Sequence, residues 1–294
     1  MASRITIHAN PLLLERGVRG VAGQPMEIVV HLPTSPGFST TGFELNSAFP
    51  GPHVLGAVPA LLREADARPE ARLLVFGHAD EAASEGHNKQ LADRRGQVLL
   101  ALLTQDMELF DQVSVDDAWR LIHYQAILKQ LGLEPMPVDD KPGPVTARGT
   151  RRFQQRYNAA AYHPSGGRAR AHADLIVDGK LGQKTQAALR DSYLNQLSGK
   201  LDRSRFFGPS FAGCGEFNRM GSPEQDRRAV LVLYRPDFPT ESKIPCKAGD
   251  ADSCKLNRKA NHPWKCNFYR RTIEGETSAE SKLPSSGSSF KFSV

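Results

Sequence analysis

The most visible absence in this sequence is a long apolar run. Among the 294 residues, no stretch comes near the ~20 consecutive apolar residues that span a bilayer; the longest apolar neighbourhoods are as short as residues 98–103. The start of the chain has no apolar core of a secretory signal either, because Glu15, Arg16 and Arg19 interrupt it. We therefore expect no membrane-spanning segment and, for a protein that works outside the cytoplasm, a specialised export route in place of Sec.

Motifs for catalysis and cofactor binding are also missing. The sequence contains no HExxH, P-loop, dinucleotide fingerprint or GxSxG nucleophile elbow. His78, Asp80 and His87 lie close together, but without the two-ligand helical spacing of a zinc centre. We expect a protein that is not an enzyme and that needs no cofactor or metal.

Cysteine is scarce and unevenly placed. The four cysteines, Cys214, Cys246, Cys254 and Cys266, all lie in the last third of the chain. Because there is no CxxC, a zinc ribbon is a poor fit. An even number permits two disulfides in three possible pairings, which would suit an oxidising compartment. Reduced, partly buried thiols are the alternative.

The charge balance is basic but dispersed. The formal net charge is +6, with 39% hydrophobic and 24% charged residues, a composition that allows a buried core and excludes a wholly disordered chain. Clusters such as Arg148, Arg151, Arg152 and Arg156 have no accompanying aromatic ladder, so we do not expect nucleic-acid binding. An acidic polymer such as the cell wall remains a suitable partner for a basic surface.

Strand-like and helix-like segments alternate from residue 43 onward. Residues 43–49 could form a strand, residues 55–65 a helix and residues 73–76 a buried strand. Asn88 is a candidate N-cap for a helix with an apolar stripe that reaches Leu102. This alternation predicts α/β layer packing.

Residues 104–200 have a different character. Helical patterns at 121–131, 146–157 and 184–194 alternate with turn-rich loops, and strand patterns return only afterwards, at 206–211 and 229–234. A strand pattern that resumes after a helical stretch indicates an insertion within one domain.

The expected fold class is therefore α/β, an α+β sandwich with a βαβα-β core and an inserted, small all-α three-helix domain. The expected units are residues 1–40, an arm or strands of unassigned role; 41–104 and 201–236, the two halves of the α/β domain; 105–200, the helical insertion; 237–276, a cysteine-containing extension; and 277–294, a Ser- and Gly-rich flexible tail.

One constellation of residues carries the functional hypothesis. Residues 77–80 read Gly-His-Ala-Asp, Asn88 follows Asp80 by eight positions, Leu91 follows Asn88 by three, and Arg95 follows Asp80 by fifteen. This order and spacing resemble the OmpA-like peptidoglycan-binding domain, whose pattern is roughly G-H-T-D, eight residues to N-x-x-L and then an arginine.

Three further segments extend the resemblance over roughly residues 41–104 and 200–236. Residues 43–47 are similar to the family's first strand, and residues 213–216, which contain Cys214, and 226–230 are similar to its G-x-G-E and N-R-R-V segments. Where the family usually has Thr, Ser, Ala and Asn, this chain has Ala79, Ala92, Gly96 and Asp226.

The resemblance implies a binding site for the diaminopimelate of the peptidoglycan stem peptide, which carries an ammonium and a carboxylate at one end. In that reading Asp80 accepts hydrogen bonds from the ammonium, and Arg95 forks onto the carboxylate. The residues that would line or support the pocket are Asn46, Asn88, Leu91, Arg227 and Arg228. The alternative is purely structural: Asp80 as a turn residue, Asn88 as an N-cap and Arg95 on a solvated helix face.

The helical insertion has a resemblance of its own. Residues 125–132, residues 150–155 and above all residues 178–189 are similar to the three-helix peptidoglycan-binding-like domain, whose signature ends in D-G-x-x-G-x-x-T-x-x-A-L. The matching residues mainly specify a fold, since Asp178 and Gly179 form a turn and Thr185 precedes a helix. The segment either binds the wall or acts as a spacer.

We therefore expect non-catalytic binding of peptidoglycan that anchors the protein, or its assembly, to the cell wall in the envelope or periplasm. Two alternatives stay open. One is a peptidoglycan-cleaving enzyme. The other is a scaffold or accessory part of a type VI or contractile injection machine, whose wall-like domains contact proteins.

Overall fold

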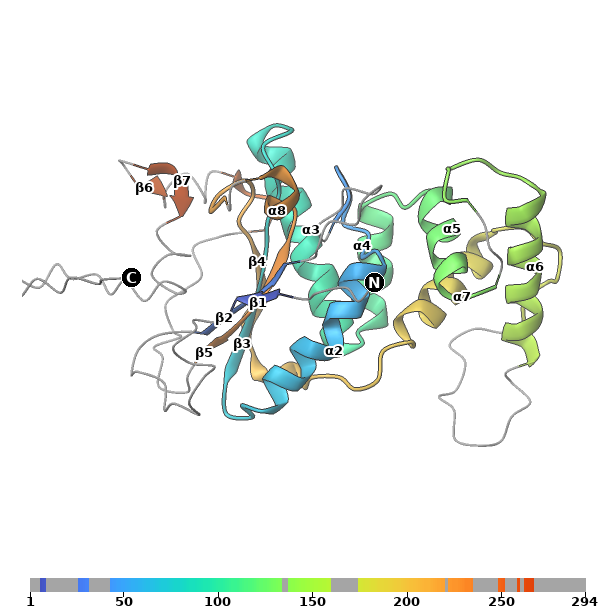
Figure 1. The fold of residues 1–294 in the computed structure, drawn as a ribbon, viewed down its shortest axis with the longest axis horizontal. Helices are drawn as coiled ribbons and strands as arrows, with labels where there is room; N and C mark the ends of the chain where they lie inside the picture. Colours follow the sequence, from blue (N-terminus) through green and yellow to red (C-terminus); the bar gives the residue numbers. More distant parts are fainter. Residues whose placement is uncertain are drawn as a thin grey trace, which may run out of the picture.

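The structure is a computed structural model. It describes residues 6–8, 26–31, 43–133, 137–159, 174–219, 222–234, 248–251, 258–259 and 262–266, with the backbone alone for 6–8, 26–31, 258–259 and 262–266. Within these ranges the fold is mixed α/β, with a sheet covered by helices (Figure 1). No helix in these ranges is long and apolar enough to cross a membrane.

The main sheet has five strands in the order β1-β2-β5-β3-β4. Strands β3 and β4 run parallel, and all the other neighbours are antiparallel. The strands are β1 (Thr6–His8), β2 (Met26–His31), β3 (Arg72–Gly77), β4 (Phe206–Gly213) and β5 (Ala229–Tyr234), and β6 (Arg258–Lys259) and β7 (His262–Cys266) form a separate pair. The strands predicted at 73–76, 206–211 and 229–234 are confirmed.

Seven α-helices accompany the sheet in the described part of the chain. They are α2 (Pro52–Asp66), α3 (Glu85–Thr104), α4 (Met107–Asp116), α5 (Leu121–Gln130), α6 (Pro144–Ala159), α7 (Gln183–Leu194) and the short α8 (Pro223–Asp226), with a 3-10 turn, η2 (Arg203–Arg205). The helices predicted at 121–131, 146–157 and 184–194 are present as α5, α6 and α7. Helix α4 was not predicted. Its cap is Asp106, whose carboxylate accepts a hydrogen bond from the backbone N–H of Leu109.

Two details of the prediction are wrong. Residues 43–49 form a turn-containing loop instead of a strand, because Asn46 adopts a left-handed backbone conformation with φ 53°. Helix α3 begins earlier than expected: Ser84 is its N-cap and accepts a hydrogen bond from the N–H of His87. Asn88 therefore lies inside the first turns of α3, where its side chain is available for other contacts.

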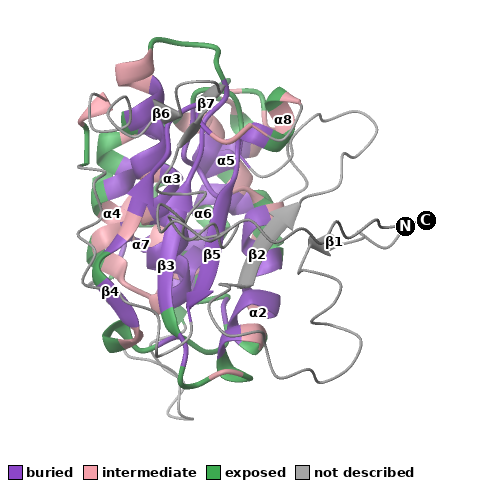
Figure 2. Cartoon of the chain, turned by 90° about the vertical axis from the view of Figure 1, so that its left-hand side faces the viewer, coloured by how far each residue is buried: buried purple, intermediate pink, exposed green. Residues whose placement is uncertain are grey.

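Both faces of the sheet are buried. Leu73 and Val75 of β3 belong to the large core beneath helices α2 and α3, whereas Leu74 and Phe76 belong to a second cluster on the opposite face. The purple strands β3 and β5 in Figure 2 show this burial. A strand buried on both sides reads as a continuous apolar run, which is why residues 73–76 were recognisable in the sequence.

Helices α5, α6 and α7 extend away from the sheet (Figure 1). The core is nonetheless continuous from the sheet into these helices. At the junction Phe49 packs against Trp119, His123 and Tyr193, with ring centroids 4.9, 4.9 and 6.0 Å away. The hydroxyl of Tyr193 donates a hydrogen bond to the carbonyl of Pro50 at 2.9 Å. The helices are thus attached to the α/β layer by an aromatic cluster.

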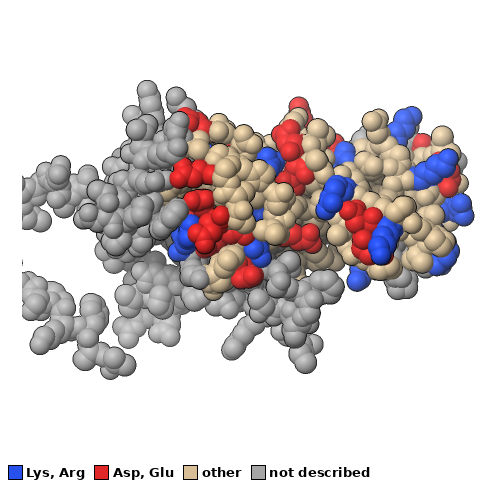
Figure 3. Space-filling model, turned by 90° about the horizontal axis from the view of Figure 1, so that it is seen from above, with Lys and Arg blue, Asp and Glu red and all other residues tan. Residues whose placement is uncertain are grey.

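Charge is unevenly distributed over the surface. Helix α6 contains four arginines and no acidic residue. Lys and Arg side chains gather at the end of the molecule formed by the helices in Figure 3, whereas Asp and Glu are more frequent toward the sheet.

Candidate functional site

The candidate site lies where β3 ends and α3 begins. The close approach of these elements requires a glycine at position 77, because a Cβ atom there would lie 1.8 Å from the carbonyl oxygen of Ala92. With α3 this close, the connecting loop places His78 and Asp80 beside the first turns of the helix. His78 is buried, and its Nδ1 lies 3.2 Å from the carbonyl oxygen of Phe217. Burial is the main reason that the pKa of His78 is well below its ordinary value.

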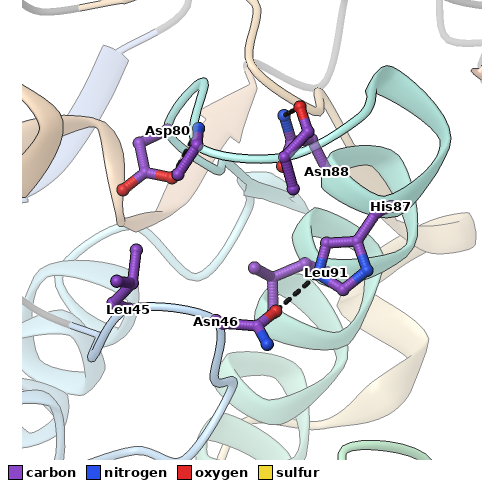
Figure 4. A pocket seen from close by; sticks show the side chains of 8 residues that line it. Leu45, Asn46, Asp80, His87, Asn88 and Leu91 are labelled. Carbon is purple, nitrogen blue, oxygen red and sulfur yellow. Dashed lines mark hydrogen bonds between the residues drawn. The ribbon is translucent and has the colours of Figure 1, made fainter.

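A pocket of about 300 Å³ opens between this loop, helix α3 and the loop at residues 43–49. Its wall combines apolar and polar side chains. Figure 4 shows Asp80 and Asn88 on one side and Leu45 and Asn46 on the other, with Leu91 and His87 contributed by α3. The remaining wall comes from Ala82 and Ala83.

Asp80 contributes a carboxylate to this wall. Its Oδ2 accepts a hydrogen bond from Nη1 of Arg227 at 2.8 Å, and its Oδ1 accepts from the N–H of Ala82 at 3.3 Å. Arg227 is itself oriented by donation from Nε to the carbonyl of Phe43 at 3.2 Å. A carboxylate can accept about four hydrogen bonds. Asp80 is therefore held in place and still has acceptor capacity for a guest.

Asn88 contributes a second acceptor. Its Nδ2 donates to the carbonyl of Ala83 at 2.9 Å and to Oε2 of Glu216 at 2.6 Å. Two acceptors around one atom identify it as the amide nitrogen. The residue is 1% exposed, and its Oδ1 has no hydrogen-bond partner among the described residues. A buried polar atom without a partner is costly, so a donor from a ligand would stabilise it.

Arg95 is not part of the pocket wall. The residue is 0% exposed, and its Nε, Nη1 and Nη2 donate to the carbonyls of Ser47, His78 and Glu44 at 3.0, 2.9 and 2.9 Å. The predicted fork of Arg95 onto a ligand carboxylate does not fit this arrangement, because its nitrogens face backbone oxygens. Its role here is to position the pocket: it ties the end of β3 to the loop that carries Asn46.

The Arg95 side chain is fully enclosed. Its guanidinium lies 5.3 Å from the centre of the Phe43 ring. Burial lowers the pKa of Arg95 to about 9, and the nearby Asp80 carboxylate partly offsets this effect. The guanidinium of Arg95 therefore remains a cation at neutral pH, and its charge stabilises the nearby Asp80 carboxylate.

The other predicted residues divide into two groups. Asn46 and Leu91 line the pocket as expected, and Oδ1 of Asn46 lies 2.5 Å from Nε2 of His87. Arg227 supports the pocket through Asp80. Arg228 does not reach it: this residue donates to the carbonyl of Asn218 at 2.7 Å and pairs with Asp226 at 3.7 Å.

Several residues of the site were not predicted. Leu45, 62% exposed at the pocket mouth, and His87 both line the pocket, and Glu216 orients Asn88 from behind. Glu216 belongs to the G-x-G-E segment, so that motif carried a signal for it. The position of His87, directly before Asn88 on the same helix, was a weaker signal.

The arrangement offers hydrogen-bond acceptors and apolar surface to a ligand. Among the described residues no three His, Cys, Asp or Glu side chains are placed to hold a metal ion. Cys214 is buried in the apolar cluster on the opposite face of the sheet, away from the pocket. Disulfides were considered among Cys214, Cys246, Cys254 and Cys266. The side chains of the last three lie outside the described part of the chain.

Comparison of the chain with protein-family models, with curated proteins and with solved structures finds no match to any of them.

Proposed function

We propose that the protein binds peptidoglycan without cleaving it, by holding the amine-bearing residue of a stem peptide in the pocket between β3 and α3. The observation that carries this proposal is a pocket lined by a fixed carboxylate, Asp80, and by Asn88, whose enclosed amide oxygen has no hydrogen-bond partner among the described residues. Both are acceptors, and an ammonium group is the donor that satisfies them together.

The convergence of the sequence segments supports the proposal. The segments that resemble the OmpA-like domain are far apart in the sequence yet contact one another in the fold. Asp80 pairs with Arg227, Asn88 with Glu216, and Arg95 with the loop at residues 43–47. The backbone adds to this, since the N–H of Ala79 donates to the carbonyl of Gly215 at 2.8 Å. Residues whose only role is to cap a helix or form a turn would not need these long-range contacts. On this basis we infer an OmpA-like core with an inserted, wall-binding type of helical domain.

A sedimentation assay with purified sacculi tests the proposal. The wild type should co-sediment with the sacculi, and Asp80→Asn should weaken binding at least about tenfold, because a charge-assisted hydrogen bond contributes about 1.5–3 kcal/mol. The matched control is Asp116→Asn, which removes an exposed carboxylate of α4 that does not line the pocket. Control and wild type should bind equally.

The same assay separates the alternatives. A wall-cleaving enzyme would release soluble muropeptides from the sacculi, and a scaffold protein would remain in the supernatant while co-purifying with a protein partner. If wild type and Asp80→Asn were retained equally on the sacculi, the pocket would not be the binding site, even if the protein binds peptidoglycan elsewhere.

A further inference from the structure

We propose that the pocket selects an amine at the end of an aliphatic chain and does not read a neighbouring carboxylate, so that it accepts lysine-type and diaminopimelate-type stem peptides alike. This inference rests on the proposed function, because it specifies the ligand of the same site. It departs from the zwitterion recognition that the sequence resemblance implies.

Two hydrogen-bond acceptors, on Asp80 and Asn88, favour an amine. Asp80, whose carboxylate has spare lone pairs, and Asn88 both line the pocket, and the enclosed Oδ1 of Asn88 has no hydrogen-bond partner among the described residues. The side-chain nitrogen of Asn88 already serves Ala83 and Glu216, so the amide cannot turn over to offer a donor without losing both bonds. Asp80 and Asn88 thus present acceptors that suit a group that only donates, as an ammonium does. The other polar side chains of the wall, Asn46 and His87, contact each other through Oδ1 and Nε2.

The described pocket wall has no cationic partner for a ligand carboxylate. No lysine or arginine is among the described residues that line the pocket. The guanidinium groups of Arg95 and Arg227, which both interact with Asp80, already have other acceptors or Asp80 itself as partners: Arg95 donates to three backbone carbonyls, and Arg227 donates to Asp80 and Phe43. Because a carboxylate is recognised best by a bidentate guanidinium fork, a second charged group on the ligand gains little here.

Two leucines give the pocket an apolar part. Leu45 at the mouth and Leu91 inside offer apolar surface on the way to Asp80 and Asn88. A side chain with a methylene stem and a charged tip matches this gradient, since the stem buries apolar area while the tip keeps its hydrogen bonds. Lysine and diaminopimelate share this stem and this amine. They differ at the carboxylate alone.

Four synthetic tripeptides of the sequence L-Ala-γ-D-Glu-X test the inference by calorimetry with the full chain. The third residue X is meso-diaminopimelate, its form amidated at the side-chain carboxylate, L-lysine or Nε-acetyl-L-lysine. We expect the first three to bind with dissociation constants within about threefold of one another, and acetylated lysine to bind at least about tenfold more weakly, because acetylation removes the cation. Leu45→Ala, at an exposed position, should weaken the first three equally.

The outcomes are distinguishable. Binding of diaminopimelate that is tenfold or more tighter than that of both lysine and the amidated form would overturn the inference and leave the proposed function intact. Acetylated lysine that binds as well as lysine, or four peptides that all fail to bind, would overturn amine recognition. Retention on sacculi would then decide separately whether the protein binds the wall at all.

Discussion

Nη1 of Arg227 lies 2.8 Å from Oδ2 of Asp80, although the two residues are 147 positions apart in the sequence. Both side chains are less than a tenth exposed. The pair joins the loop after β3 to the turn before β5, and the same carboxylate faces the pocket. Asp80 is therefore part of the fold as well as part of the proposed site, and the choice of substitution decides which property an experiment measures.

Asp80→Ala should lower the free energy of unfolding by about 3 kcal/mol, because it leaves the buried Arg227 cation with only the more distant and partly exposed Glu224 carboxylate, at 3.8 Å. Asp80→Asn should cost less, since the amide oxygen can still accept from Arg227. Urea unfolding of the two variants measures the difference. A loss of less than about 1 kcal/mol for Asp80→Ala would show that the pair is open to water in solution.

Arg95→Met should lower the free energy of unfolding by at least about 3 kcal/mol, because the buried bonds to the carbonyls of Ser47 and His78 and the partly buried bond to Glu44 are all lost. Arg63→Met, which changes an exposed arginine in the last turn of α2, is the matched control and should stay within about 0.5 kcal/mol of the wild type. Unfolding curves of both variants provide the comparison. If Arg95→Met were as stable as the control but lost ligand affinity, Arg95 would be a ligand contact after all.

Gly77→Ala should disrupt the contact between β3 and α3, because the added methyl group would meet the carbonyl oxygen of Ala92. We expect a loss of stability of more than about 3 kcal/mol, together with weaker wall binding. Gly56→Ala, in α2, has open space around the added atom. It should stabilise the protein by about 0.5–1 kcal/mol, and thermal unfolding of the pair checks both signs.

His123 should make the protein less stable in mild acid. Burial lowers its pKa to about 4 from an ordinary 6.5, so above pH 6.5 the residue is neutral in both states and has no effect. Between pH 6.5 and 4 the unfolded chain binds a proton that the folded protein does not, and stability falls by up to about 3 kcal/mol. His123→Gln should reduce this fall when urea unfolding at pH 7 and pH 4.5 is compared. If His123→Gln lost as much stability between pH 7 and pH 4.5 as the wild type, other titrating groups would cause the loss.

Much of the α/β layer could be predicted because local patterns determine it. Residues 73–76 and 229–234 read as buried strands because both of their faces are covered. The loop at residues 43–49 could not be predicted: it is held by distant groups, including the carboxylate of Asp117, which accepts from the N–H of Ala48 at 2.8 Å. A short apolar segment resembles a strand until such long-range contacts are known.

The candidate site was predictable in part for a similar reason. The resemblance to the OmpA-like motif implied that Asp80, Asn88 and Leu91 lie in one pocket, and the pocket lining contains all three. A sequence motif could not indicate the partners of Arg95. It gives the position of the arginine in the chain, but not whether its guanidinium binds a ligand or backbone carbonyls. Leu45 was equally invisible, because its exposure depends on the conformation of the loop at residues 43–49.

The most direct measurement is a crystal structure of the protein with a lysine-containing stem tripeptide. The account predicts the ligand ammonium within about 3 Å of a carboxylate oxygen of Asp80 and of Oδ1 of Asn88, with Arg95 still bonded to the carbonyls of Glu44, Ser47 and His78. A ligand bound elsewhere on the protein, or a ligand carboxylate seated on Arg95 after displacement of the loop at residues 43–47, would contradict it.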